Sequence, residues 1–193
     1  MRKTVLRRTA AAVLVLGGLS SGGAARAADR QGTVEFIYGR YEIADARFRD
    51  VYPGSGPALG IALTAALFAH LDFSLEVGHL ARTGALTYTK ETTRFRLVPV
   101  SFALRYVYPG KILQPFAGGG LDYNIYYERN AIGTTVNAAR GAHVQAGLYL
   151  RFGPRFPVLL VGKARYVWAK TDESGRAVDL GGWEYHGGLG VAF

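Results

Sequence analysis

GGWEYHGGLGVAF, the stretch from Gly181 to Phe193, decides the fold predicted for this chain of 193 residues. Large apolar and aromatic side chains alternate in it with small and polar ones, as in an extended strand whose two faces differ. One face carries Trp183, Tyr185, Leu189, Val191 and Phe193, and the other carries Glu184, His186, Gly188, Gly190 and Ala192. A strand that turns one face to lipid and the other to a narrow polar interior needs this pattern. A half-buried strand of a soluble sheet is the alternative.

The amino-terminal residues follow the order of features that marks a secretory signal peptide. A basic head (Arg2, Lys3, Arg7 and Arg8) precedes an apolar and small-residue run at residues 9–20, and the small-x-small sequence Ala25-Arg26-Ala27 follows. The run is too short for a membrane-spanning helix, which needs about 20 residues. We therefore expect residues 1–27 to be a signal peptide; an amino-terminal anchor or a buried helix is the alternative.

Composition limits the classes of partner. The full chain has 23 basic and 14 acidic side chains. Five of the basic ones lie in residues 1–27, so 18 basic and 14 acidic side chains remain and give a net charge of +4. The chain has no basic stripe with interleaved aromatic residues, which argues against nucleic acid as a partner. It also has no cysteine, so no disulfide stabilises it.

The same alternation divides the rest of the chain into seven further strands. The expected strands are residues 33–44, 58–68, 72–82, 93–108, 112–128, 140–152 and 158–170, and residues 181–193 form the eighth. Residues 58–68 are rich in alanine and leucine and could form a short helix, but their strict alternation of large and small residues favours a strand. Longer connections are expected at residues 45–57, 83–92, 129–139 and 171–180, alternating with short turns.

The expected strand 93–108 departs from the pattern. Pro99 cannot donate a backbone hydrogen bond, so we expect a bulge or weak pairing there. Phe95 and Leu97 are out of phase with the apolar face formed by the rest of this strand.

Eight strands long enough to cross a bilayer at a tilt of about 45° indicate an all-β, transmembrane, antiparallel up-and-down barrel over residues 28–193. The pattern resembles the small eight-stranded outer-membrane proteins of the OmpA-barrel, OmpX and OmpW group, and the sequence PFAGGGLDYN (115–124) is similar to a strand common there. The resemblance implies a bacterial outer-membrane location, surrounded by outer-membrane lipid and lipopolysaccharide. It also implies that the closing strand is an assembly signal read by the barrel-assembly machinery, carried by Phe193, Val191, Leu189 and Tyr185.

Eight charged side chains fall on the predicted interior face. They are Glu35, Glu76, Asp122 and Glu184, with Arg105, Arg151, Lys163 and Arg165. The interior of an eight-stranded barrel is just wide enough for side chains, and an unpaired buried charge is costly. We therefore expect a salt-bridged plug, with Arg165 near His186 and a diagonal step from Glu184. A gated narrow pore or a proton-active lumen is the alternative.

The sequence predicts no catalytic, cofactor or metal site. The histidines His70, His79, His143 and His186 lack the serine two residues later that a lipid A deacylase of this kind would have, and their spacing does not suit a metal. No serine is expected near His143 or His186. We expect a structural or surface-interaction protein, not an enzyme. The alternatives are a narrow pore or binding site for small hydrophobic molecules, as the OmpW resemblance allows, and a lipid A-modifying enzyme.

Overall fold

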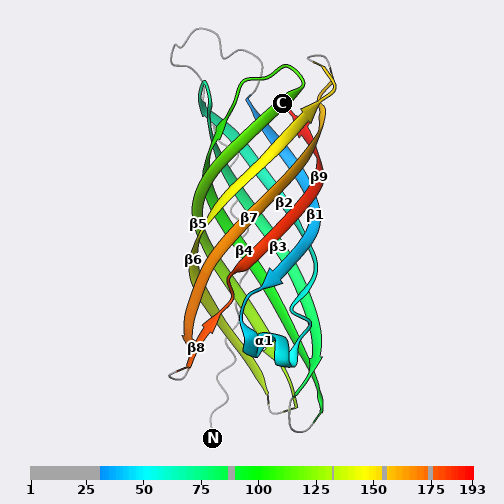
Figure 1. The fold of residues 1–193 in the computed structure, drawn as a ribbon, viewed down its shortest axis with the longest axis vertical. Coiled ribbons are helices and arrows are strands. Elements are labelled where there is room, and N and C mark those ends of the chain that lie inside the picture. Colours follow the sequence, from blue (N-terminus) through cyan, green and yellow to red (C-terminus); the bar gives the residue numbers. More distant parts are fainter. Residues whose placement is uncertain (1–30, 87–89, 132, 154–155, 174–175) are drawn as a thin grey trace, which may run out of the picture.

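The computed structural model describes residues 31–86, 90–131, 133–153, 156–173 and 176–193, and these wind into a tall closed barrel (Figure 1). The long strands are β1 (Gly32–Ile43), β2 (Ser55–Phe68), β3 (Leu71–Ala85), β4 (Thr92–Val107), β5 (Leu113–Arg129), β6 (Thr134–Arg151), β7 (Val158–Glu173) and β9 (Gly182–Ala192). A short helix, α1 (Ala46–Val51), and a short strand, β8 (Arg176–Asp179), lie at one end. The predicted signal peptide, residues 1–27, lies outside the described residues.

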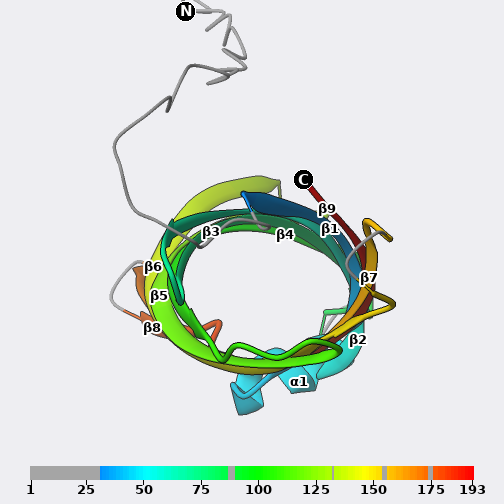
Figure 2. The same cartoon turned by 90° about the horizontal axis from the view of Figure 1, so that it is seen from above.

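Backbone pairing closes the wall. The long strands pair antiparallel with their neighbours in chain order, and the first and last of them pair from Thr33↔Ala192 to Ile43↔Gly182. β8 pairs only with the end of β7 and does not enter the ring, which Figure 2 shows from above. This confirms the predicted all-β, eight-stranded, antiparallel up-and-down barrel. None of the helices in the described part of the chain is long and apolar enough to span a membrane.

The two faces of the wall differ as the alternation predicts. Along β2, Leu59, Ile61 and Leu63 are 55%, 52% and 48% exposed, whereas Ala62 and Thr64 are fully buried in the interior. The segment is a strand over its whole length, so the helical alternative for residues 58–68 is wrong. A barrel whose outer wall carries large apolar side chains suits a lipid surrounding.

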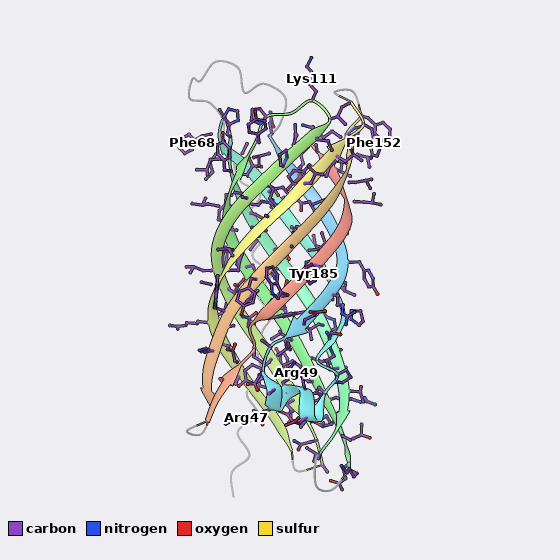
Figure 3. The ribbon with its side chains drawn as sticks, viewed as in Figure 1. Arg47, Arg49, Phe68, Lys111, Phe152 and Tyr185 are labelled. Atoms are coloured by element: carbon purple, nitrogen blue, oxygen red, sulfur yellow. The ribbon has the colours of Figure 1, made fainter. Side chains whose placement is uncertain are left out.

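The two ends of the barrel are distinguished by their connections. The turn end carries the connections that join β2 to β3, β4 to β5 and β6 to β7, and Phe68, Phe152 and Lys111 lie there in Figure 3. The loop end carries α1, with Arg47 and Arg49, and the connections that join β3 to β4 and β5 to β6.

The hairpin between β5 and β6 corrects one predicted connection. The expectation of a longer loop at residues 129–139 is wrong, because β5 continues to Arg129, β6 begins at Thr134, and residues 130–133 join them. Asn130 holds this turn: its N–H donates to the Gly133 carbonyl (3.0 Å), and its side-chain oxygen accepts from the Gly133 N–H (3.1 Å). Threonine and valine at the start of β6 have strand propensity, which the polar composition of the segment obscured.

An apolar cluster forms where α1 meets the loop end. The Phe48 ring of α1 lies 4.8 Å from the Tyr52 ring and 5.0 Å from the Phe95 ring, and Leu97 is buried in the same cluster. Phe95 and Leu97 therefore face the interior, which explains why they are out of phase with the lipid-facing side chains of β4. The helix lies within a predicted loop; Asp45 caps it by accepting from the Arg47 N–H (2.8 Å).

Pro99 interrupts the ladder between β3 and β4. Pairing between the two strands is regular up to Val77↔Val100 and resumes in the same register at Leu80↔Leu97. Residues 78 and 79, between these pairs, have no partners on β4. The weak pairing predicted at Pro99 is confirmed toward β3. Because the register does not shift, there is no bulge between these two pairs.

The outward face of β2 allows a depth-dependent test. We expect Leu63→Arg to lower the free energy of unfolding by about 2–4 kcal/mol, because it places a cation near the middle of the apolar band. Leu67→Arg, on the same face but near the turn end, should cost about 0–1 kcal/mol. Urea unfolding of the refolded barrel in lipid vesicles measures both values, and equal costs would contradict a lipid-facing wall.

Candidate functional site in the barrel interior

A network of buried charges fills the middle of the interior. Seven of the eight charges predicted there are at most 6% exposed: Glu35, Glu76, Arg105, Asp122, Lys163, Arg165 and Glu184. The eighth, Arg151, is half-buried and is the last residue of β6, at the turn end. Alternation along the strands predicts that all eight side chains face the interior. It does not predict how far along the barrel each one lies, and this position distinguishes Arg151 from the rest.

Arg165 on β7 is the centre of the larger group. Its guanidinium donates to Glu184 Oε2 on β9 through Nε (2.9 Å) and Nη2 (2.5 Å), and to Ser101 Oγ on β4 through Nη1 (2.9 Å). The same Nη1 lies 3.6 Å from Glu76 Oε1 on β3, and Lys163 donates to the other oxygen of Glu76. One planar guanidinium thus links four strands, which its fixed fork of donors makes possible.

The register between β7 and β9 corrects the predicted position of Arg165. It lies directly opposite Glu184, and Lys163 lies opposite His186. Counting residues from the loop failed because residues 176–179 form β8 and pair with an extension of β7. Gly182 then begins β9 with a φ of +152°, and a Cβ there would lie 1.8 Å from the Glu42 carbonyl oxygen, so glycine is required at this turn.

Glu35 and Arg105 form a second group nearer the turn end. Glu35 Oε1 accepts hydrogen bonds from the hydroxyls of Tyr149 (2.5 Å), Thr33 (2.9 Å) and Thr64 (3.0 Å), and from Arg105 Nη2 (3.3 Å). The Arg105 guanidinium also donates to Thr64 and lies over the Tyr149 ring, 5.8 Å from its centroid. These hydroxyl partners were not predicted as site residues, although all fall on the interior phase.

A serine, an acid and a histidine meet beside Arg165, so the expectation that no serine lies near His143 is wrong. Asp122 accepts from Ser101 Oγ (2.5 Å), and both its oxygens lie 3.0 Å from His143 Nδ1. The β4–β5 register, which puts Ser101 directly opposite Asp122, brings the serine there. A nucleophilic serine must give its proton to the histidine. Here the serine hydroxyl donates to the carboxylate instead and accepts from Arg165, so the arrangement does not activate it.

Glu76, Glu184 and His186 bring potential metal ligands within 4.8 Å of one another. Both carboxylates already bind Arg165, and Glu76 also binds Lys163. These two cations would repel a divalent ion at the same place. The donor set therefore fits an internal ion-pair network better than a metal centre.

Apolar clusters lie on both sides of the charges. The cluster nearer the turn end consists of Ile37, Val107, Phe116, Tyr149, Leu159 and Val161. The loop-end cluster described with α1 also contains Tyr41, Ile43, Leu80, Tyr126, Val167 and Leu180. The Tyr41 hydroxyl donates to the Leu180 carbonyl, which fixes the start of β9 against β1.

The residues predicted as an assembly signal lie on the outer face of the closing strand. Tyr185, Leu189, Val191 and Phe193 are each between 45% and 60% exposed. The Phe193 carbonyl accepts from the N–H groups of Gln31 (2.9 Å) and Gly32 (3.0 Å). The last residue of the chain is therefore tied to the first strand.

Comparison with known proteins identifies the fold. No family model matches the chain, and no curated protein matches its sequence. Among solved structures, Neisserial surface protein A is 16% identical with a TM-score of 0.65, covering 84% of this chain and 97% of its own. OprG of Pseudomonas aeruginosa is 15% identical with a TM-score of 0.66, covering 85% and 97%. The amino-terminal barrel of OprF from the same organism is 16% identical with a TM-score of 0.55, covering 85% and 98%. The chain thus has the fold of the small eight-stranded outer-membrane barrels, as predicted.

Arg165 and Glu184 allow a double-mutant cycle. Arg165→Ala or Glu184→Ala alone should cost about 3–5 kcal/mol of unfolding free energy, because each leaves a buried charge without its main partner. The double variant should cost less than the sum, with a coupling of about 0.5–3 kcal/mol. Arg40 and Glu42, an ion pair at 3.1 Å on the outer wall, provide the control, with a coupling of about 1 kcal/mol or less. Additive costs at the interior pair would contradict the pairing.

Proposed function

We propose that this chain is an outer-membrane barrel protein with a structural or surface-interaction role, whose polar lumen is plugged by its own side chains. One observation carries the proposal: each of the seven buried charges of the predicted set has an oppositely charged group near it within the barrel. Glu35 meets Arg105, and Glu76, Asp122 and Glu184 are all within 4.0 Å of a nitrogen of Arg165 or Lys163.

Pairing of this kind opposes ion flow. An ion moving along the axis would have to replace a buried carboxylate–guanidinium contact and pass the apolar cluster at each end. Both steps remove charge from favourable surroundings in a medium of low dielectric constant. A lumen without a wide water path leaves the outer wall and the two ends as the surfaces available for function.

The orientation of the chain follows from the connections. Barrels of this fold have short periplasmic turns and longer extracellular loops. The connection between β1 and β2, residues 44–54 with α1, is longer than any at the turn end, so we place the loop end outside the cell. Arg47 and Arg49 are exposed on α1 and would be available to a surface partner. The fold itself supports an outer-membrane location, with the outward side chains in contact with outer-membrane lipid and lipopolysaccharide.

Assembly forms a second part of the proposal. We assign the outward residues of β9, ending at Phe193, to recognition by the barrel-assembly machinery. Their exposure supports this, because these side chains remain accessible even when the barrel is closed. The backbone link from Phe193 to Gln31 and Gly32 would form last, as β1 and β9 meet.

One observation favours a different function, the passage or binding of small hydrophobic molecules. The ladder is interrupted beside Pro99, and a cavity of about 10 Å³ at this place touches outward Leu59 and His79 as well as interior Glu76 and Arg165. The cavity has room for about one water molecule, so a lateral route would need the wall to open further.

A plugged lumen predicts that the barrel conducts few or no ions. Refolded protein in planar bilayers should give small or no steady conductance, because no continuous water path crosses the charge network. The matched variant carries Arg165→Ala and Glu184→Ala, which remove the central pair without leaving one of its charges alone, and it should conduct more than the wild type. Large, stable channels from the wild-type protein would contradict the plug.

The same preparation separates the two candidate functions. Uptake of a small apolar dye into proteoliposomes should not depend on the barrel if the lumen is plugged. If the wall opens beside Pro99, uptake should exceed that of empty vesicles, and Pro99→Val, which restores a backbone donor, should reduce it.

The terminal residue tests the assembly role. Replacing Phe193 with Asp should lower the fraction of folded, detergent-resistant barrel in outer membranes by several-fold. Phe68→Asp is the control, because Phe68 is also an outward phenylalanine at the turn end, 72% exposed against 60% for Phe193. Equal yields of the two variants in membranes would contradict a specific role for the terminus.

A further inference from the structure

A group of basic side chains surrounds a hollow on the outer wall at the loop end. Arg94 and Arg96 of β4 and Arg129 of β5 line it, together with His79, Tyr127 and Thr134. The hollow has a volume of about 380 Å³; these side chains are exposed on the outer face, and half-buried Val98 also lines it. We call it the arginine hollow.

The arginines of the hollow oppose one another across the strands. Arg94 lies directly opposite Arg129 in the β4–β5 register, and Arg96 follows on the same face, opposite Tyr127. Like charges placed directly opposite in a sheet destabilise it. Among the described residues, no carboxylate lies within ion-pairing distance of these three guanidinium groups. The fold therefore concentrates positive charge here without compensating it.

Another outward arginine shows the contrast. Arg40 of β1 bonds Glu42 at 3.1 Å and donates to Ser55 at 2.5 Å. Its charge is compensated within the protein. The arginine hollow differs in needing an anion from outside.

The depth of the hollow indicates where that anion comes from. Nearer the turn end, the outer faces of the same two strands are apolar, with Phe102, Leu104, Leu121 and Tyr123 between 44% and 68% exposed. The arginines thus stand at the border between the apolar band and the loop end, the level at which lipid headgroups lie. Guanidinium groups bind phosphate through paired hydrogen bonds.

We propose that the arginine hollow binds the phosphates of a membrane lipid in the outer leaflet. The inference rests on the proposed outer-membrane location and adds a specific lipid site to it. The guanidinium groups of Arg94, Arg96 and Arg129 hold the phosphate oxygens, and their mutual repulsion is relieved when the lipid is bound.

The test uses the refolded barrel in nanodiscs of phosphatidylcholine that contain a small fraction of rough lipopolysaccharide. Native mass spectrometry counts the lipopolysaccharide molecules retained on the protein. Replacing Arg94, Arg96 and Arg129 with Gln should lower the affinity by about fivefold for each charge removed. Arg40→Gln, which removes an outward arginine already compensated within the chain, should leave retention unchanged. Equal retention by the wild type and the triple variant would overturn the proposal.

Two further arms identify the ligand. Lipopolysaccharide stripped of its phosphates should be retained no better by the wild type than by the triple variant; retention equal to that of the phosphorylated form would overturn the assignment to phosphate. Inorganic phosphate at 
about tenfold molar excess over the lipid should not displace it; displacement would overturn the assignment to a lipid.

The unfolding midpoint gives an independent test, because the effect of Arg129→Gln on stability should depend on whether lipopolysaccharide is present. In bilayers of phosphatidylcholine alone, Arg129→Gln should leave the unfolding midpoint unchanged or raise it, because it removes the repulsion from Arg94. With lipopolysaccharide present, the wild type should gain more stability than the variant. Loss of stability by the variant in both lipids would overturn the proposal. A wild-type barrel that fails to insert into either bilayer would instead contradict the proposed membrane location.

Discussion

A guanidinium group withdrawn from water must be surrounded by acceptors, and the interior of this barrel is arranged around that requirement at Arg165. Its contacts reach Glu184, Ser101 and Glu76 on three other strands. Both carboxylates are buried and lie beside this guanidinium, so removing any member of the group exposes the others to the cost of an unpaired buried charge. The polar interior therefore ties β7 and β9 to β3 and β4 across the lumen.

The parts of this structure that depend on side-chain alternation could be predicted from the sequence. The interior phase of Glu35, Arg105 and Lys163 follows from period-two spacing alone, since a strand in a closed wall has only two faces. The parts that depend on pairing between strands could not. Ser101 reaches Asp122 because their strands are in register, and β8 shifts the pairing of Arg165 by using residues that read as loop. Strand ends were also underestimated, because polar residues beyond the apolar band still form hairpins.

The charges around Arg165 in the interior and the arginines of the hollow on the outer wall differ in whether the chain supplies an opposite charge. Inside, the charges around Arg165 and Arg105 are matched by opposite charges of the same chain, and apolar clusters pack toward both ends. Outside, Arg94 and Arg129 face each other on the wall without a carboxylate beside them in the described structure. The first arrangement makes the interior independent of its surroundings, while the second makes the outer wall depend on the membrane that it contacts.

The extended hairpin of β5 and β6 leaves one edge of β6 without a neighbouring strand. Pairing between β6 and β7 ends at Arg140↔Lys170, after which β7 turns to β8 and residues 134–139 of β6 are paired with β5 alone. Within the hydrocarbon core of a bilayer such an edge would leave amide groups without partners, at a cost of several kcal/mol for each. Above it, water can hydrate the edge, and an extended peptide from another molecule could add to it as a further strand. The height at which β6 and β7 separate thus sets the greatest depth to which this barrel can sit in its membrane.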